Sequence, residues 1–257
     1  MSTHRPRKRF GQHFLHDAGV IERIVRAIAP RAGQTIVEIG PGQGALTRPL
    51  RESLAALQVI EIDRDLAAGL RELHGESLQV HCADALAFDF GALPAGARIV
   101  GNLPYNISTP LLFHLAQWAD RLGDMHFMLQ REVVQRMVAQ ASTPAYGRLS
   151  VMLQVRYRME MLFGVSSDAF TPPPAVESAI VRMVPLAAAE RPQVDGKVFA
   201  EVVARAFSAR RKTLRNALKL DDAALGKLGL EPKLRPENLS PADYVCVANF
   251  VSAACVR

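Results

Sequence analysis

The feature that most constrains the fold is an apolar segment followed by closely spaced glycines, residues 35–47 (TIVEIGPGQGALT). The first five residues are apolar apart from Thr35 and Glu38, which is typical of a central parallel strand. Gly40 and Gly42 then allow a sharp turn and a close approach of the main chain to a ligand. This strand–turn–helix unit predicts an α/β fold that binds a ligand at the carboxyl ends of its strands.

Hydrophobic periodicity predicts that strands and helices alternate along most of the chain. Strands are expected at residues 35–39, 57–62, 78–82, 97–101, 125–129, 149–157 and 178–184. Helices are expected at residues 17–29, 44–55, 64–73, 108–119 and 130–140. This order favours a Rossmann-like sheet of about seven strands with helices on both faces. Because no helix separates the last two strands, we expect a hairpin that makes the final strand antiparallel.

A short alanine-rich stretch between Pro185 and Pro192 is predicted to separate two domains. Beyond it, only helices are expected, at residues 196–219, 221–228 and 240–254. We therefore predict an α/β domain over residues 1–186 and a small all-helical domain over residues 187–257. At 257 residues, the chain is long enough for one large core and a small second lobe.

Positive charge is concentrated at the two ends of the chain. Residues 1–31 hold seven Lys and Arg against two acidic residues, and residues 187–257 hold twelve against eight. The region between them is net negative, which suggests that basic flanking elements bind a polyanion. A simple solvated surface is the alternative. Arg210, Arg211, Lys212 and Arg215 are expected on one helix, with 211 and 215 on one face, and are the candidate phosphate-binding residues.

Four successive strand ends carry residues that suit one ligand. These residues are Gly40, Glu61, Asp84 and Asn102. In a doubly wound sheet such ends border a single crevice, where one carboxylate can accept ribose hydroxyls and another an adenine amino group. Residues 40–45 also satisfy the dinucleotide pattern G-x-G-x-x-A, and Glu61 follows Gly40 by 21 positions. A site for NAD, as in a dehydrogenase, therefore remains an alternative.

The segment Asn102-Leu103-Pro104-Tyr105 follows the fourth predicted strand. It offers an amide oxygen, main-chain carbonyls and an aromatic face, a set that suits a planar ring carrying an amino group. An aromatic amine is a poor nucleophile because its lone pair is delocalised into the ring. Acceptors held on its hydrogens favour the reactive pyramidal form. The structural alternative is an ordinary turn with Tyr105 in the core.

Seven segments in one order carry a resemblance to a known family: KRFGQHFL (8–15), VEIGPGQGALT (37–47), VIEIDRD (59–65), NLPYNIS (102–108), LQREVV (129–134), FTPPPAV (170–176) and FSARRKTLRN (207–216). Over about residues 5–250 the chain resembles the ribosomal RNA adenine N6,N6-dimethyltransferases, specifically the bacterial KsgA/RsmA branch. These are class I methyltransferases. The resemblance implies S-adenosylmethionine as cofactor, bound by His13, Leu15, Gly40, Glu61, Asp84 and Asn102.

The same resemblance implies a substrate and a set of catalytic residues. The substrate would be two adjacent adenines in a hairpin near the 3′ end of 16S rRNA, within the small ribosomal subunit or its precursor. Each adenine would leave its stack and receive two methyl groups. The catalytic residues would be Asn102, Leu103, Pro104 and Tyr105, with Phe170 as a second ring against the flipped base.

Other assignments remain open within and outside this class. The motifs also suit large-subunit rRNA adenine methyltransferases of the macrolide-resistance type, mitochondrial transcription-factor relatives, or a ribosome-assembly factor that acts mainly by binding. Cys82, Cys246 and Cys255 lack metal-ligand spacing, so no metal is expected. No apolar run reaches the ~18 residues of a membrane span, and the basic N-terminus lacks the apolar segment of a secretory signal. We expect a cytoplasmic monomer.

Overall fold

The structure is a computed structural model that describes residues 7, 11–54 and 56–255. Arg5, Lys8 and Arg9 of the basic N-terminus lie outside the described residues. Contacts divide the chain into two units: Met1–Val134 with Met159–Pro185, and Gln135–Arg158 with Leu186–Arg257. Each unit has its own hydrophobic core. Within the described residues, no helix is both long and apolar enough to cross a membrane.

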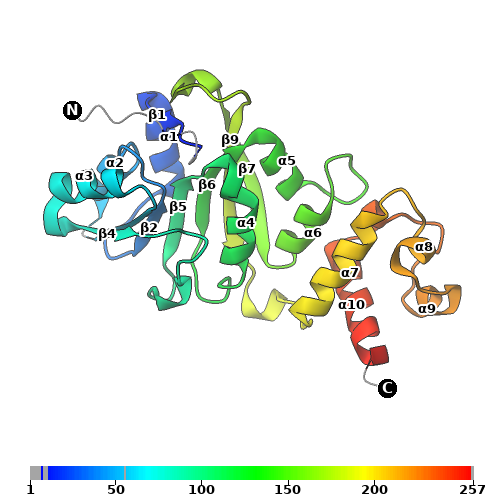
Figure 1. The fold of residues 1–257 in the computed structure, drawn as a ribbon. Helices are drawn as coiled ribbons and strands as arrows, with labels where there is room; N and C mark the ends of the chain where they lie inside the picture. Colours follow the sequence, from blue (N-terminus) through cyan, green and yellow to red (C-terminus); the bar gives the residue numbers. More distant parts are fainter. Residues whose placement is uncertain (1–6, 8–10, 55, 256–257) are drawn as a thin grey trace. The chain divides into compact units, whose positions relative to one another are not determined.

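A seven-stranded sheet runs through the larger unit in the order β4-β3-β2-β5-β6-β9-β7 (Figure 1). Its strands are β2 (Ile36–Ile39), β3 (Leu57–Glu61), β4 (Leu78–Cys82), β5 (Arg98–Asn102), β6 (Met125–Gln130), β7 (Tyr157–Val165) and β9 (Ser178–Pro185). The pairs β4–β3, β3–β2, β2–β5 and β5–β6 are parallel, whereas β9 is antiparallel to β6. The predicted Rossmann-like sheet with an antiparallel last strand is confirmed.

One helix precedes β2, and helices connect most successive strands of this sheet (Figure 1). They are α1 (Ala18–Ile28), α2 (Thr47–Ser53), α3 (Arg64–His74), α4 (Tyr105–Ala116) and α5 (Arg131–Val138). Two carboxylates cap helix N-termini and so satisfy main-chain N–H groups that have no partner within the helix. Asp17 accepts from the N–H of Val20 at 2.8 Å, and Asp63 accepts from that of Asp65 at 3.1 Å.

The N-terminal segment, residues 11–15, lies at the carboxyl ends of the sheet strands. Its short strand β1 (Phe14–Leu15) pairs antiparallel with β8 (Phe170–Thr171), and Leu15 lies opposite Phe170. The N–H of His16 also donates to the carbonyl of Ala169 at 2.9 Å. These bonds hold residues 11–15 beside the ends of β2 and β5.

One predicted strand is wrong. Residues 149–157 were expected as a strand, but α6 (Arg148–Gln154) is a helix and β7 begins only at Tyr157. A short apolar run does not distinguish a strand from a buried helix. Here Val151 and Val155 pack into the core of the smaller unit. Residues 135–158 therefore belong with the helical unit and not, as expected, with residues 1–134.

Apart from Tyr157 and Arg158 at the start of β7, the described part of the smaller unit has helices as its regular elements, as predicted for the C-terminal domain. They are α6, α7 (Gly196–Ser208), α8 (Leu214–Leu218), α9 (Asp222–Lys227) and α10 (Pro241–Cys255). The single helix expected over residues 196–219 is wrong, because residues 209–213 form a turn between α7 and α8. The N–H of Leu214 donates to the carbonyl of Leu234 at 2.7 Å, outside any helical pattern. Arg210, Arg211 and Lys212 therefore lie in a turn and do not share a helix with Arg215.

Candidate active site

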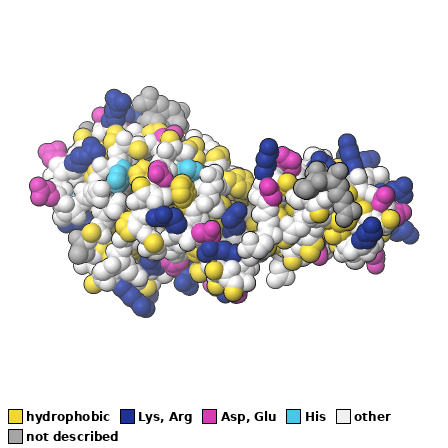
Figure 2. Space-filling view, turned by 90° about the horizontal axis from the view of Figure 1, so that it is seen from below, with side chains coloured by type: hydrophobic (Ala, Val, Ile, Leu, Met, Phe, Trp, Pro, Cys, Tyr) yellow, Lys and Arg dark blue, Asp and Glu magenta, His cyan; other side chains and the backbone are white. Residues whose placement is uncertain are grey.

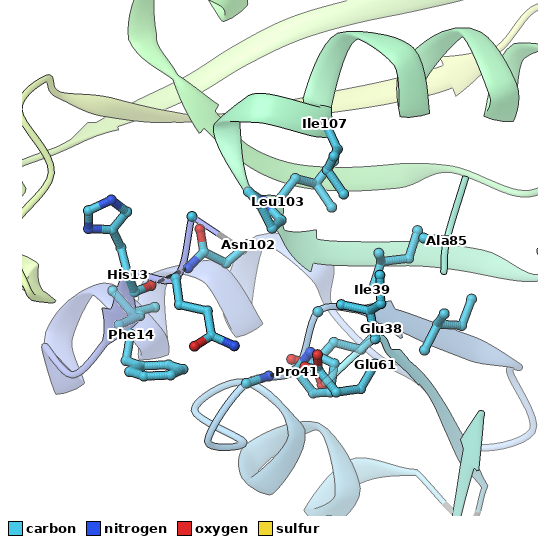
Figure 3. Close-up of a pocket in the computed structure, with 18 of the residues that line it drawn as sticks. His13, Phe14, Glu38, Ile39, Pro41, Glu61, Ala85, Asn102, Leu103 and Ile107 are labelled. Carbon is cyan, nitrogen blue, oxygen red and sulfur yellow. Dashed lines mark hydrogen bonds between the residues drawn. The ribbon is translucent and has the colours of Figure 1, made fainter. Parts of the chain in front are cut away.

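A pocket of about 310 Å³ lies at the carboxyl ends of the parallel strands (Figure 3). Its lining comes from five segments of the larger unit: residues 11–15, 38–46, 60–62, 83–85 and 102–107. The pocket brings together these predicted site residues: His13, Leu15, Gly40, Glu61, Asp84, Asn102, Leu103, Pro104 and Tyr105. The residues that follow the predicted strands therefore line one cavity.

The turn after β2 requires glycine for two separate reasons. Gly40 and Gly42 have φ angles of +66° and +57°, which residues that carry a Cβ rarely adopt. A Cβ on Gly42 would also lie 3.1 Å from ring carbons of Phe14. The N–H of Gly40 donates to the carbonyl of Ile60 at 2.9 Å, which fixes the turn against β3. The main chain of the turn therefore forms one wall of the pocket.

Glu61 ends β3 as a buried carboxylate on this wall, with 5% of its surface exposed. Its two oxygens accept from the N–H groups of Asp63 at 2.9 Å and Gly42 at 3.2 Å. Burial raises the pKa of Glu61, and these two hydrogen bonds oppose that rise. Because a carboxylate can accept about four hydrogen bonds, acceptor capacity remains for a ligand.

Glu38 lies beneath the glycine turn and is also buried. The hydroxyl of Thr47 donates to its carboxylate at 2.6 Å. Burial raises the pKa of Glu38 to about 7, although the bond from Thr47 lowers it. Asp84 differs from both glutamates because its side chain is exposed at the end of β4. One of its oxygens accepts from the N–H of Leu86 at 2.9 Å.

The turn after β5 is held from three directions. The side-chain nitrogen of Asn102 donates to the carbonyl of His13 at 3.1 Å (Figure 3). The N–H of Leu103 donates to the carbonyl of Met128 at 3.2 Å, and the hydroxyl of Tyr105 lies 2.7 Å from that of Ser178. As its nitrogen is bonded, the amide of Asn102 presents its oxygen as an acceptor. Tyr105 presents a ring whose centroid is 5.9 Å from that of His13.

The structure does not bring Phe170 into the pocket. The ring is 2% exposed and belongs to the hydrophobic core of the larger unit. It lies on β8, opposite Leu15. In this structure Phe170 is therefore a core residue, which differs from the expected second ring against a base.

Several residues of the site were not identified from the sequence. Phe14 and Ile62 line the pocket, and Ile62 is 45% exposed, so it offers an apolar wall. Gly101 allows the close approach of β5 to β2, because a Cβ there would lie 2.4 Å from the carbonyl oxygen of Ile39. A glycine within a strand pattern was the available signal for this last residue.

The chemistry of the pocket lining suits S-adenosylmethionine. The pocket combines a glycine turn for close main-chain approach, the partly exposed apolar Ile62, a buried carboxylate that retains acceptor capacity, and a second carboxylate at its rim. Such a set is suited to a nucleoside with ribose hydroxyls and an adenine amine, and its negative charge is suited to a sulfonium cation. In the described part of the chain, no group of His, Cys, Asp and Glu could hold a metal ion. Fold and pocket together define a class I S-adenosylmethionine-dependent methyltransferase.

Comparisons with known proteins identify the family within this class of methyltransferases. Residues 3–252 match the family described as "Ribosomal RNA adenine dimethylase". The chain belongs to this family. It is 58% identical to "Ribosomal RNA small subunit methyltransferase A" of Aromatoleum aromaticum, covering 100% of this chain and 98% of the relative. It is 57% identical to the protein of the same name from Thiobacillus denitrificans, covering 97% and 99%.

Solved structures show the same fold. A dimethyladenosine transferase from Plasmodium falciparum superposes with a TM-score of 0.81 at 23% identity, covering 95% of this chain and 98% of that one. The 23S rRNA methyltransferase ErmE gives a TM-score of 0.70 at 25% identity, covering 93% and 99%. Its family and its relatives at 57–58% identity make the protein an S-adenosylmethionine-dependent methyltransferase that modifies adenine in ribosomal RNA.

Proposed function

We propose that this protein dimethylates N6 of two adjacent adenines in a hairpin near the 3′ end of 16S rRNA. The observation that carries the proposal is the amide of Asn102, oriented by the carbonyl of His13 beside the ring of Tyr105, in the same pocket as Glu61. The relatives at 57–58% identity are named for methylation of small-subunit rRNA and align over nearly their whole length. That similarity favours the small subunit over the large-subunit alternative.

S-adenosylmethionine supplies an electrophilic methyl group on a sulfonium. Glu61 accepts hydrogen bonds from ribose hydroxyls, and Asp84 accepts from the adenine amine at the rim. The turn at Gly40 allows the main chain to approach the ligand closely. His13 and Leu15 cover the pocket from the N-terminal segment, since β1 is held there by β8.

The target adenine enters beside Asn102, after it has left its stack. The amide oxygen of Asn102 and the carbonyl of Leu103 or Pro104 accept the two amino hydrogens. Tyr105 stacks on the base. The amine loses its proton readily once methylated, so no side chain is needed as a general base. The pocket must also accept N6-monomethyladenine, because each adenine is methylated twice.

Contacts to RNA phosphates come from the turn between α7 and α8. Arg211 and Lys212 are exposed there, and Arg215 on α8 lies 3.4 Å from Asp222 in an exposed ion pair. Figure 2 shows Lys and Arg side chains on the surface of the unit that contains these helices, with acidic side chains among them. Arg210 is different, because it donates to Glu237 at 2.6 Å and to the carbonyl of Pro144 at 3.0 Å. We assign phosphate binding to Arg211, Lys212 and Arg215, and a structural role to Arg210.

One labelling experiment tests the proposed function. Purified protein is incubated with labelled S-adenosylmethionine and small subunits that lack adenine dimethylation, and the modified nucleotides are mapped. We expect label on two adjacent adenines near the 3′ end of 16S rRNA. A parallel reaction contains large subunits, and label only there would support the macrolide-resistance type of activity. Binding without label would support an assembly factor.

The proposal also covers the cellular location and the oligomeric state of the protein. A substrate within the small ribosomal subunit or its precursor places the reaction in the cytoplasm. One copy contains the whole pocket, so we propose a monomer. Light scattering of the purified protein would show a mass of about 28.1 kDa. A mass of twice this value would contradict the monomer.

A further inference from the structure

The hydroxyl of Tyr105 has a partner on a distant strand. It lies 2.7 Å from the hydroxyl of Ser178, which is fully buried at the start of β9. Burial raises the pKa of Tyr105, and the bond to Ser178 lowers it, so the phenol remains protonated at neutral pH. The hydrogen bond therefore joins two neutral hydroxyls, of which either can donate.

The position of Ser178 is set by the sheet. Ser178 lies opposite Gln130 where β9 pairs with β6, and the residue that follows β6, Arg131, donates its N–H to the carbonyl of Glu177 at 2.9 Å. These main-chain bonds fix both sides of Ser178. Its hydroxyl is thus a fixed point to which the ring of Tyr105 is attached.

The hydrogen bond to Ser178 adds a constraint on the ring of Tyr105. Tyr105 is the first residue of α4 and lines the pocket, where its ring centroid lies 5.9 Å from that of His13. A phenylalanine ring would offer a base the same apolar face, so stacking alone does not require the hydroxyl. A hydroxyl bonded to a buried serine restricts the side-chain torsions and thereby the plane of the ring.

We propose that Ser178 is a positioning residue for methyl transfer: it holds the ring of Tyr105 in the plane on which the target adenine stacks. The proposal rests on the proposed function, because it assigns Tyr105 to the base. It gives the antiparallel strand β9 a role in the reaction. With the bond between Leu103 and Met128, it ties the catalytic turn to both β6 and β9.

The test is a double-mutant cycle on whole small subunits, with Ser178→Ala, Tyr105→Phe and the double variant. Each single change removes the same hydrogen bond, so kcat should fall by about 5-fold in each, and the double variant should fall no further. The KM for small subunits should stay within about twofold, because phosphate contacts supply most RNA affinity. The affinity for S-adenosylmethionine should also be unchanged. Ser178→Thr keeps the hydroxyl and should retain most of kcat.

Ser108→Ala is the matched control. Ser108 is also buried and donates to the main-chain carbonyl of Tyr105 at 3.0 Å, so it contacts the same residue without holding its ring. Thermal unfolding of all variants separates stability from turnover. The inference is overturned if kcat is unchanged in Ser178→Ala, if the two single effects multiply, or if Ser108→Ala lowers kcat equally. A wild-type protein that labels no adenine would overturn the proposed function itself.

Discussion

The side chain of Asn102 donates to the main-chain carbonyl of His13 at 3.1 Å, across 89 positions of sequence. An amide has one donor end and one acceptor end, so a partner on the nitrogen decides where the oxygen points. Because that partner is a main-chain carbonyl, the orientation of Asn102 depends on the path of the N-terminal segment. That path is held in turn by the pairing of β1 with β8.

Replacing Asn102 tests the assignment of the amide oxygen. Asn102→Ala should lower the rate of methyl transfer by at least about 100-fold, the usual effect of losing a preorganised group that acts in the transition state. Binding of RNA should change little, because the oxygen is proposed to act on the amine during reaction. Single-turnover kinetics on unmethylated small subunits give the rate. Near-normal turnover would show that the catalytic role is wrong.

Removing the carboxylate of Glu61 should weaken S-adenosylmethionine binding. Loss of charge-assisted hydrogen bonds costs roughly 1.5–3 kcal/mol, so Glu61→Ala should raise the dissociation constant by about 10- to 150-fold. Calorimetric titration measures this constant. Asp65→Ala is the control, because that carboxylate is exposed on the first turn of α3. Equal affinities in the wild type and Glu61→Ala would contradict a contact with the ribose.

The turn between α7 and α8 predicts a salt-dependent effect on RNA binding. Arg211→Ala combined with Lys212→Ala should weaken substrate binding. It should also make log affinity fall less steeply with log salt, by about 0.7–0.9 in slope for each phosphate that is no longer bound. Adding Arg215→Ala should make the salt dependence less steep by a similar amount. Binding curves at several salt concentrations give the slope, and an unchanged slope would remove these residues from the RNA interface.

Arg210→Ala provides the matched comparison for that variant. Its bonds to Glu237 and the carbonyl of Pro144 hold the turn, so its loss should lower the thermal unfolding temperature more than the loss of Arg211 does. The salt slope of Arg210→Ala should remain close to that of the wild type. A stable Arg210→Ala protein with a reduced slope would instead return Arg210 to the phosphate-binding set.

Glu38 predicts a pH dependence of stability. Its pKa is raised from 4.5 to about 7, so between these pH values the folded state holds a proton that the unfolded state has lost. Stability then falls as pH rises, by about 1.4 kcal/mol per pH unit and roughly 3 kcal/mol over the whole window. Glu38→Gln should remove this component, which urea unfolding of both proteins from pH 5 to pH 8 would measure. Parallel pH profiles for the two proteins would contradict it.

Much of the site could be predicted because its residues follow strand ends. Apolar runs that end in Gly40, Glu61, Asp84 and Asn102 identify the strands, and parallel topology brings their carboxyl ends together. The pocket confirms that convergence. The role of Asp63 as the cap of α3 was also predictable, since a short acidic side chain precedes an amphipathic segment.

The incorrect secondary-structure predictions at residues 149–157 and 196–219 share one cause. The apolar residues of α6 resembled a strand, and only the core of the smaller unit shows that Val151 packs from a helix, with Val155 at its C-cap. The basic run at residues 210–215 resembled one helix, but the N–H of Leu214 bonds to Leu234 instead. In both places a tertiary partner overrides local preference, which no short window of sequence contains.

The sequence by itself determined the parallel α/β order, the glycine turn and the residue types at each strand end, because these depend on periodicity and local backbone freedom. Only the tertiary structure decided that Phe170 faces the core, that Arg210 is paired, and that Ser178 reaches Tyr105. Each of these depends on a contact between segments far apart in the chain. Such contacts are selected by packing and by the need to satisfy buried polar groups, so they emerge only when the whole fold is assembled.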